Sequence, residues 1–420
     1  MLIEFKVANY RSFRTAQTLS MVGGSFPEHR DSNTFDAGLS GFGRFLRSSV
    51  VYGPNAAGKT NLLRALQFVK GLVVNSASTP PATPLSYDPF KFAKDTRNAP
   101  SEFQISFVQN GTRYEYGFAM DATRICEEWL IEYVNPRGRT IFERTYKKRG
   151  GKYQWKFSSY LKGQRAVWRE ATRKEVLFLS MATQLNSAQL LPVFEWFQKR
   201  LVVVVGVTTL NPILTLQLLD KPDGKEQLLP FLREADLGIT GVDINREAMS
   251  AGGGAMMLIG SPIIEQRPGS PPSLVKVTFS HLGDDKKSIP LGFEEESAGT
   301  QVLFRSAGAW LNVFANAEVL LFDEIDTSLH PKLTRFLIGK FHSKTTNPNN
   351  AQLIFSTHNT SFLDQDLFRR DQIWFVEKDR DGSTKLYPLT DFRPRNDEAL
   401  ERWYMRGRYG ALPVLDEIQK

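Results

Sequence analysis

The stretch from Gly53 to Thr60 constrains what this chain can fold into more than any other. It fits the phosphate-binding pattern G-x-x-x-x-G-K-[ST], and its residues in order are Gly53, Pro54, Asn55, Ala56, Ala57, Gly58, Lys59 and Thr60. A β-rich run at 48–52 precedes it, and the residues from Asn61 onward have the apolar spacing of a helix. The alternative is a chance match in a glycine-rich turn, but the strand and helix on either side of the motif argue against it. A strand, a glycine loop and a helix N-terminus together form an anion site.

Each residue type in this loop suits a phosphate ligand. Gly53 and Gly58 let the backbone turn tightly, so that its N–H groups face phosphate oxygens. Lys59 is expected to reach the β- and γ-phosphates, and the Thr60 hydroxyl is expected to hold Mg²⁺. We expect the whole stretch from Gly53 to Asn61 to contact the phosphates.

A second motif lies far downstream, where an apolar run at 319–322 ends in Asp323 and Glu324. The run predicts a buried strand of a parallel sheet. Asp323, at its carboxyl end, is expected to bind Mg²⁺ directly or through water, and Glu324 to orient and polarise the attacking water. A core strand ending in a solvated acidic turn is the alternative, but the phosphate loop makes the catalytic interpretation the stronger one.

Composition sets further bounds. The 420 residues are 41% hydrophobic and 23% charged, as in ordinary globular proteins. The longest apolar runs are too short to span a membrane, and the N-terminus alternates like a strand instead of resembling a signal peptide. The single cysteine, Cys126, excludes an internal disulfide and a cysteine-based metal site, and suits a small hydrophobe in a strand. These features predict a cytoplasmic protein with no membrane partner.

The pattern along the chain predicts an α/β fold with four parts. Residues 1–75 form the N-terminal half of an ATPase head, and alternating runs at 76–160 indicate an antiparallel β lobe. Residues 161–273 are mainly helical, with a flexible or hairpin tip at Gly252–Gly254. Residues 274–420 return to the α/β pattern and complete the head with mixed and parallel sheet and flanking helices. Since neither half contains a full site, one nucleotide-binding domain split by an insertion explains the two distant motifs.

Three smaller motifs indicate which class of phosphate-loop protein this chain resembles. They are Glu296–Thr300, which opens a helix, Asp326–Pro331, which follows Glu324, and Ser356–Asn359, which closes the next strand. Their order resembles the ABC-type ATPase heads of SMC and RecF proteins. It is also similar to the stand-alone bacterial AAA/ABC ATPases of anti-phage operons, including RloA-like and OLD-like proteins. The N-terminal run Asn9–Phe13 and the C-terminal run Gly407–Pro413 resemble the RloA-like branch, and the resemblance covers nearly the whole chain.

The resemblance implies a role for each matching residue. Ser297 and Gly299 match the signature motif, which contacts the γ-phosphate of ATP held by a second protomer. The sequence here is Ser-Ala-Gly-Thr, a looser variant, and Ser297 as a simple helix cap is the alternative. Asp326 matches the loop at the dimer interface, and His358 matches the switch histidine that reads the γ-phosphate. A histidine after a strand is otherwise more often structural.

Two further positions stay open. Gln104 is a weak candidate for the lid glutamine of these heads. Arg11 is expected either to touch nucleotide or a basic partner surface, or to form an ordinary salt bridge. The cofactors implied are ATP and Mg²⁺, and the implied assembly is a head-to-head dimer or higher homo-oligomer that ATP closes and hydrolysis opens.

Charge is concentrated in one segment. Residues 137–174 contain thirteen Lys or Arg and two Glu, a net charge of +11 against +8 for the whole chain. Aromatic residues alternate with these cations, which suits a nucleic-acid backbone with stacked bases. The alternatives are a lobe with its aromatics inside and its cations on a solvated face, and an acidic protein partner.

Three functions compete at this point. The first is the ATPase sensor of an anti-phage defence system that controls a separate effector, either a nuclease or a toxin. About 60 residues follow His358, too few for the Toprim-type nuclease domain of OLD-like proteins, so the effector is expected to be another protein. The second is a RecF-like DNA-repair clamp, and the third is a nucleotide-sensing scaffold that does not hydrolyse ATP.

Overall fold

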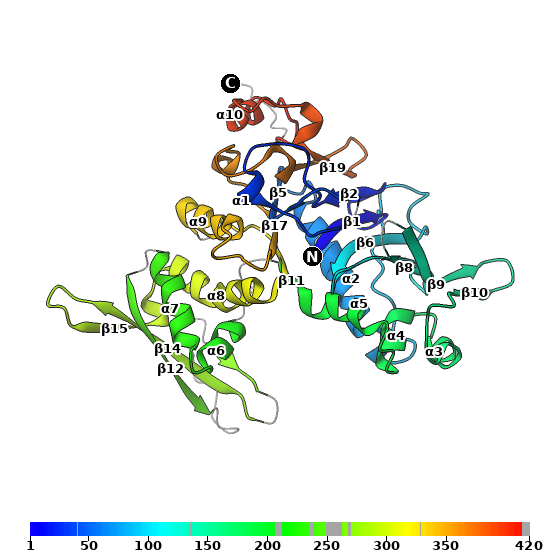
Figure 1. Ribbon diagram of the computed structural model, residues 1–420, viewed down its shortest axis with the longest axis horizontal. Coiled ribbons are helices and arrows are strands. Elements are labelled where there is room, and N and C mark those ends of the chain that lie inside the picture. The colour runs from blue at the N-terminus through cyan, green and yellow to red at the C-terminus, as the bar shows by residue number, and fades with distance from the viewer. Residues whose placement is uncertain are drawn as a thin grey trace. The chain divides into compact units, whose positions relative to one another are not determined.

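The chain is mixed α/β and divides into two compact units. The computed structural model describes residues 1–39, 41–134, 137–205, 212–235, 238–248, 263–267, 270–327 and 329–413 (Figure 1). The first unit comprises Met1–Val205, Asn316–Ile325 and Ile338–Lys420, and the second comprises Gly206–Ala315 and Asp326–Leu337. The tip expected at Gly252–Gly254 lies outside the described residues.

A six-stranded sheet forms the centre of the first unit. Its strands, in spatial order, are β11 (Leu201–Val204), β16 (Val319–Phe322), β17 (Gln352–Ser356), β5 (Ser48–Tyr52), β18 (Ile373–Lys378) and β19 (Thr384–Pro388). The first five are parallel, and β19 pairs antiparallel with β18. Every residue of β5, β16 and β17 is buried, as their continuous apolar sequences predict. The buried strand expected before Asp323 is therefore confirmed.

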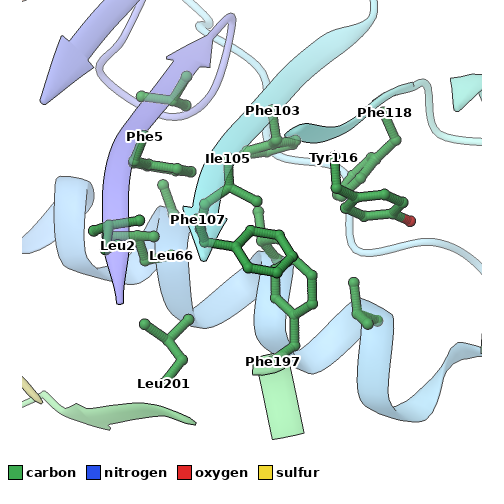
Figure 2. Close-up of a cluster of buried hydrophobic side chains, with 14 of the residues drawn as sticks. Leu2, Phe5, Leu66, Phe103, Ile105, Phe107, Tyr116, Phe118, Phe197 and Leu201 are labelled. Carbon is green, nitrogen blue, oxygen red and sulfur yellow. The ribbon is translucent and has the colours of Figure 1, made fainter. Parts of the chain in front are cut away.

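Helix α2 (Lys59–Asn75) starts directly after the phosphate loop. Its buried face comprises Leu62, Leu63, Leu66, Val69 and Val73, the helical spacing expected from the sequence. This face belongs to a large core that includes Phe5, Phe107 and Phe197 (Figure 2). Aromatic stacking adds to that core, since the rings of Phe107 and Trp196 lie 4.2 Å apart.

A seven-stranded antiparallel sheet shares this core. Its order is β10 (Lys152–Phe157), β9 (Arg137–Lys147), β8 (Ile125–Val134), β7 (Thr112–Met120), β6 (Ser101–Gln109), β1 (Leu2–Ala8) and β2 (Gln17–Ser20). The meander expected after residue 100 is present, and the turn at Asn110–Gly111 has the positive φ values of 51° and 75° that this dipeptide favours. The sheet also includes β1 and β2, which join it through the pairing of β1 with β6.

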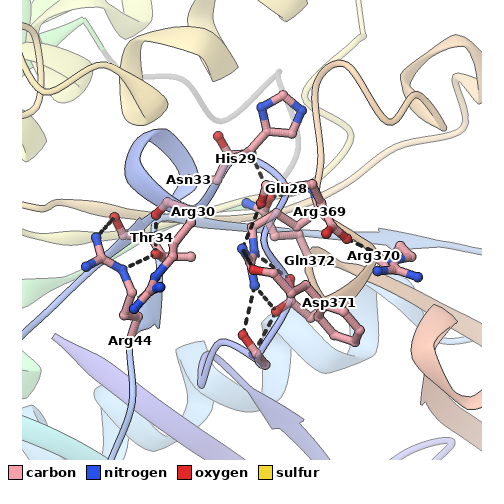
Figure 3. A network of polar contacts seen from close by, with 12 residues as sticks. Glu28, His29, Arg30, Asn33, Thr34, Arg44, Arg369, Arg370, Asp371 and Gln372 are labelled. Atoms are coloured by element: carbon pink, nitrogen blue, oxygen red, sulfur yellow. Dashed lines mark hydrogen bonds and ion pairs between the residues drawn. The ribbon is translucent and has the colours of Figure 1, made fainter. Parts of the chain in front are cut away.

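Short elements complete the first unit. They are α1 (Arg30–Asn33), β3 (Thr34–Phe35), β4 (Phe45–Leu46), α3 (Arg165–Ala171), α4 (Phe178–Gln184), α5 (Leu191–Glu195) and α10 (Leu400–Met405). A polar network holds residues of the stretch at 24–47 (Figure 3). At its centre the Arg369 guanidinium donates to Asp371 and to the carbonyls of Gly24, Phe26 and Glu28.

The second unit contains a smaller sheet and several helices. Its strands are β12 (Ile239–Ala248), β13 (Ile263–Glu265), β14 (Ser273–Leu282) and β15 (Ser288–Gly292), and β14 pairs with each of the others. Its helices are α6 (Ile213–Leu219), α7 (Gly224–Glu234) and nearly all of α8 (Ala298–Asn316), and α9 (Pro331–His342) begins there. Phe279, Phe293 and Phe304 pack against one another. The interval expected to be mainly helical thus includes the ten-residue strand β12.

Candidate active site

The phosphate loop lies between β5 and α2 and is held tightly by its neighbours. Gly53 has φ 156° and Gly58 has φ 121°. A Cβ on Gly53 would lie 2.2 Å from the Val376 carbonyl oxygen, and one on Gly58 would lie 2.4 Å from Thr384 Oγ1. Only glycine fits these two positions, so the motif is required by the local packing as well as by any ligand.

The loop has the chemistry of an anion cradle. The buried Lys59 ammonium donates to the carbonyls of Gly53 at 2.7 Å and Pro54 at 3.1 Å, so it folds back over the loop. Within the described residues, the backbone N–H groups of Asn55, Ala56 and Gly58 have no intramolecular acceptor. Free N–H groups at the start of a 17-residue helix, with a lysine beside them, fit the phosphates of a nucleotide.

The two acidic residues lie where β16 ends and differ in environment. Asp323 is buried, and its N–H donates to the Val204 carbonyl at 2.9 Å. Glu324 has φ 51°, a left-handed conformation that is rare outside glycine, and its side chain is half exposed. Strained backbone of this kind is concentrated at functional sites.

Ser356, the last residue of β17, connects the two. Its hydroxyl donates to Asp323 Oδ1 at 2.5 Å and accepts the Glu324 N–H at 2.8 Å. The Ile325 N–H donates to the Ser356 carbonyl at 3.2 Å. The sequence placed Ser356 in a motif but gave it no role. Its position on the neighbouring strand, which only the sheet order defines, lets it hold the Asp323 carboxylate and the Glu324 backbone.

His358 also follows β17 and faces Glu324. Its Nε2 lies 3.9 Å from Glu324 Oε1, and both side chains are partly exposed, by 40% and 46%. The carboxyl ends of neighbouring parallel strands thus bring together Asp323, Glu324 and His358, three of the residues predicted from the sequence. Ligands of open α/β sheets bind at this edge.

A hollow of about 740 Å³, which we call the histidine-side hollow, opens beside the first half of the phosphate loop. Gly53 to Asn55 line one part, and Thr357, His358 and Thr360 line another. The remaining wall includes Tyr404 and Met405 from α10, and Leu412 and Pro413 from the C-terminal run. That run is fixed by hydrogen bonds from the Ala411 N–H to Glu377 and from the Tyr404 hydroxyl to the Ala411 carbonyl.

A smaller hollow of about 280 Å³ includes Arg11, Ser12, Asn61 and Gly382. Arg11 Nε lies 3.2 Å from Asp88 Oδ2, so the salt-bridge interpretation of Arg11 is the one that the structure describes. The Asn61 side chain donates to Ser12 Oγ at 2.9 Å, and Thr384 Oγ1 donates to the Ala57 carbonyl. Ser12 and Thr384 support the phosphate loop, yet no local pattern identified them. Thr60 is partly exposed at the start of α2.

The signature residues lie in the second unit. Ser297 Oγ accepts the Thr300 N–H at 3.1 Å, so it caps α8, the alternative left open by the sequence. Ser297 and Gly299 also line a hollow of about 470 Å³ with His330 and Lys332. Asp326 opens the turn that precedes α9, and its carbonyl accepts the Leu329 N–H. The same helix N-terminus can be capped by Ser297 and can also recognise a phosphate, so the cap does not exclude the signature role. That role stays a prediction.

The weak lid candidate Gln104 and the single cysteine Cys126 lie away from the loop. Gln104 is in the middle of β6, opposite Lys6 and Gly117, and no described contact joins it to the site. The Cys126 thiol contacts the Asp121 carboxylate, and burial raises the pKa of Cys126 to about 12, which leaves the thiol protonated and unreactive.

A metal would depend here on Thr60, Asp323 and the nucleotide itself. The residues that the structure describes hold no group of three or more His, Cys, Asp or Glu side chains able to bind a metal ion. An oxygen set of one hydroxyl, one carboxylate and phosphates is what Mg²⁺ prefers. Among the same residues, no helix combines the length and apolar character that a membrane crossing requires.

One comparison with known proteins identifies a family. The model of the family described as "AAA domain, putative AbiEii toxin, Type IV TA system" matches residues 48–176 and 215–364. The two segments include the phosphate loop, Asp323, Glu324 and His358. No curated protein matches this chain.

Proposed function

This chain belongs to the AAA-domain family whose model spans both halves of the site, and we propose that it binds and hydrolyses ATP as a conformational switch. The observation that carries the proposal is the meeting of Asp323, Glu324 and His358 beside a phosphate loop with unpaired N–H groups. An AAA domain supports the coarser statement that the chain is a nucleotide-binding ATPase. Hydrolysis by these residues is our proposal.

Each residue at the loop has a proposed task in binding. The N–H groups of Asn55, Ala56 and Gly58 donate to phosphate oxygens. The Lys59 ammonium gives up its hydrogen bonds to the loop carbonyls and donates to the β- and γ-phosphates instead. Thr60 and Asp323 would hold Mg²⁺, which neutralises developing phosphate charge when bound. Ser356 keeps the Asp323 carboxylate oriented toward that task.

Glu324 and His358 are proposed to act at the γ-phosphate end. The Glu324 side chain is half exposed, so solvent reaches its carboxylate, and we propose that this carboxylate accepts a hydrogen bond from a water molecule and orients it for in-line attack. His358 faces the same carboxylate and is proposed to donate to the γ-phosphate. When that phosphate is lost, His358 loses its acceptor, and this loss would report hydrolysis to the rest of the chain.

We further propose that the active form is a head-to-head homodimer. Ser297 and Gly299 at the N-terminus of α8 would contact the γ-phosphate held by a second copy, and Asp326 would lie at the dimer interface. ATP would close the dimer and hydrolysis would open it, which is a two-state switch governed by the γ-phosphate.

The proposed role of the switch is control of a separate effector in an anti-phage defence system. The family description names a toxin of type IV toxin–antitoxin systems, which supports a role in a bacterial conflict system. The net charge of residues 137–174 favours a second candidate, a RecF-like clamp on DNA. The two differ in one observable: the clamp requires strong stimulation of ATP hydrolysis by DNA alone.

Steady-state ATP hydrolysis by purified protein tests the catalytic proposal. Glu324→Gln should lower kcat at least about 100-fold while ATP still binds, because only the water-orienting carboxylate is lost. Lys59→Ala should abolish binding itself. Glu102→Gln is the matched control, since Glu102 is exposed on β6. Hydrolysis by Glu324→Gln at the rate of the control would refute catalysis and favour the non-hydrolysing scaffold.

Phage plating tests the defence role. Cells carrying the native locus of this chain would be compared with cells whose locus encodes Lys59→Ala or Glu102→Gln. Protection that Lys59→Ala abolishes and Glu102→Gln retains supports a nucleotide-dependent defence function. Equal plating on all strains across a broad phage panel would overturn it and leave the ATPase assignment intact.

A further inference from the structure

The tip of the β9–β10 hairpin concentrates positive charge without neutralising it. We call residues 147–152 the basic tip, which contains Lys147, Lys148, Arg149 and Lys152 around two glycines. All four cations are exposed. Among the described residues, no carboxylate lies within ion-pair distance of any of them. The tip is on the outermost hairpin of the seven-stranded sheet (Figure 1).

The register of the hairpin makes this arrangement costly for the isolated protein. Lys147 and Lys152 are directly opposite each other on the paired strands. Like charges at opposing positions destabilise a sheet. Gly150 and Gly151, with φ of 100° and 63°, close the turn and contribute no side chains between the cations. A repulsion of this kind is relieved when an anionic partner binds.

The rest of the basic segment contrasts with the tip. Arg144 is fully buried and lies 3.1 Å from Glu128, and Lys156 pairs with Glu143 at 3.0 Å. The aromatic residues mostly point inward: Phe142 and Trp168 are buried, and the Trp155 ring contacts Phe178. Tyr160 is exposed but lies outside the tip, and the tip has no aromatic residue, so base stacking, one of the alternatives left open by the sequence, has no ring at the tip.

Lysines on an edge strand also protect a sheet against edge-to-edge aggregation. That role accounts for Lys152 and Lys156 on β10, which is an edge strand. It does not account for Lys148 and Arg149, which lie in the turn beyond the strand, where no ladder group needs protection.

We propose that the basic tip is a contact for the phosphodiester backbone of nucleic acid, bound without regard to base sequence. The tip offers only exposed cations and glycines, whereas protein interfaces are anchored by Trp, Tyr and Arg side chains in well-packed, desolvated pockets. A partner recognised by charge alone must present charge at high density, as a nucleic-acid backbone does. The inference rests on the proposed function in that the tip would place the ATPase switch on nucleic acid, and it does not require nucleic acid to change the rate of ATP hydrolysis.

Fluorescence anisotropy with a labelled 30-base-pair DNA duplex tests this contact. The variant replaces all four tip cations with glutamine: K147Q/K148Q/R149Q/K152Q. Its Kd at 100 mM salt should rise about 10- to 100-fold, and the slope of log K against log salt should fall by about 3 to 4, since each lost phosphate contact removes about 0.9. A scrambled duplex should bind as tightly as the first.

The matched control is K6Q/K94Q/K221Q/K344Q, which removes the same charge from exposed lysines elsewhere. It should keep the wild-type slope. The tip variant should also melt no lower than wild type, because the Lys147–Lys152 repulsion is gone. The melting curve would reveal a variant that does not fold. In that case the single variants K148Q and R149Q replace it, and each should lower the slope of log K against log salt by about one.

Several results would overturn the proposal. One is equal binding by the tip variant and the control, and another is no binding by wild type at 50 mM salt. Displacement of the duplex by poly-L-glutamate at equal charge concentration would assign the tip to an acidic protein instead. Binding is measured without ATP, and hydrolysis is measured without DNA. A failure of this contact is therefore separate from a failure of the ATPase proposal.

Discussion

At the scale of single residues, the site depends on a serine that accepts one hydrogen bond and donates another. Ser356 fixes the Asp323 carboxylate and holds the left-handed backbone of Glu324. The carboxylates themselves were predicted from the sequence, because an acidic pair after an apolar run is a local pattern. The role of Ser356 was not, because it depends on β17 lying beside β16.

Ser356→Ala should therefore lower kcat for ATP hydrolysis by about 10- to 100-fold with little change in KM, since orientation is lost and the phosphate loop is untouched. Ser356→Thr retains the hydroxyl and should restore most of the rate. Ser361→Ala, at an exposed position nearby, is the control. A wild-type kcat in Ser356→Ala would show that positioning of Asp323 and of the Glu324 backbone by this hydroxyl does not matter for hydrolysis.

The buried His342 should make the free energy of unfolding depend on pH. Burial lowers the pKa of His342 to about 3, and its Nε2 lies 2.7 Å from Ser48 Oγ. The unfolded chain, with a histidine pKa near 6.5, takes up a proton that the folded chain does not. The free energy of unfolding should thus fall as pH drops from about 6.5 toward 3, by up to about 1.4 kcal/mol per pH unit.

Urea unfolding at pH 7, 6 and 5 would measure this. His342→Gln should flatten the dependence over that range, whereas His330→Gln, at an exposed position, should leave it unchanged. The same slope in wild type and His342→Gln would assign the pH dependence to other groups.

At the scale of elements, a buried ion pair joins the antiparallel sheet to α4. Arg144 on β9 and Glu128 on β8 are both fully buried, and Glu128 also accepts hydrogen bonds from the N–H groups of Phe178 and Leu179. From the sequence, Arg144 was only one of the thirteen cations of residues 137–174, because charge alone does not reveal burial. The pairing is defined by the register between the two strands, in which Glu128 is opposite Arg144.

Arg144→Met should destabilise the protein by about 3–5 kcal/mol, because it leaves the Glu128 carboxylate buried without its cation. The double variant Glu128→Gln/Arg144→Met should cost less than the sum of the two single changes. Arg139→Met removes a partly exposed pair with Glu132 and should cost at most about 1 kcal/mol. Chemical denaturation measures all four, and additive effects would exclude coupling between the two residues.

The C-terminal run Gly407–Pro413 forms part of the wall of the histidine-side hollow, so we expect it to affect ATP hydrolysis. Gly410 has φ 66°, and a Cβ there would lie 2.6 Å from Glu377 Oε2 and 2.7 Å from the Tyr387 hydroxyl. Gly410→Val should displace Leu412 and Pro413 from the histidine-side hollow and lower ATP hydrolysis severalfold. Gly43→Val, where a Cβ meets open space, is the control. Unchanged hydrolysis in Gly410→Val would mean that this wall has no part in the reaction.

At the scale of the whole molecule, the split site was predictable and much of the pairing was not. The phosphate loop supplies one half of a nucleotide site and Glu324 belongs to the other half, so the strands before the two motifs were predicted to share one sheet. They do: β5 precedes the loop, β16 precedes Glu324, and β17 lies between them in the sheet. The joining of β1 to β6 and the strand β12 were missed. Pairing between strands distant in sequence leaves no local periodicity, and β12 has few buried residues.

The proposed dimer is also tested at this scale. With ATP and Mg²⁺, Glu324→Gln should shift in light scattering from one copy of 47.6 kDa to about twice that mass, because ATP is bound and not consumed. Ser297→Arg should prevent the shift without loss of ATP binding. A single-copy mass for Glu324→Gln at saturating ATP would refute an ATP-closed dimer.

One of the four chain junctions between the two units falls between Ile325 and Asp326, one residue beyond Glu324. Glu324 is held at φ 51° by its bond to Ser356, so its backbone has a lower-energy conformation available if that bond breaks. A rotation about this one torsion would change the direction in which the chain enters the second unit. If ATP hydrolysis takes place at Glu324 as proposed, the backbone itself would connect the reaction to the second unit, because Glu324 lies two residues before Asp326 in the chain.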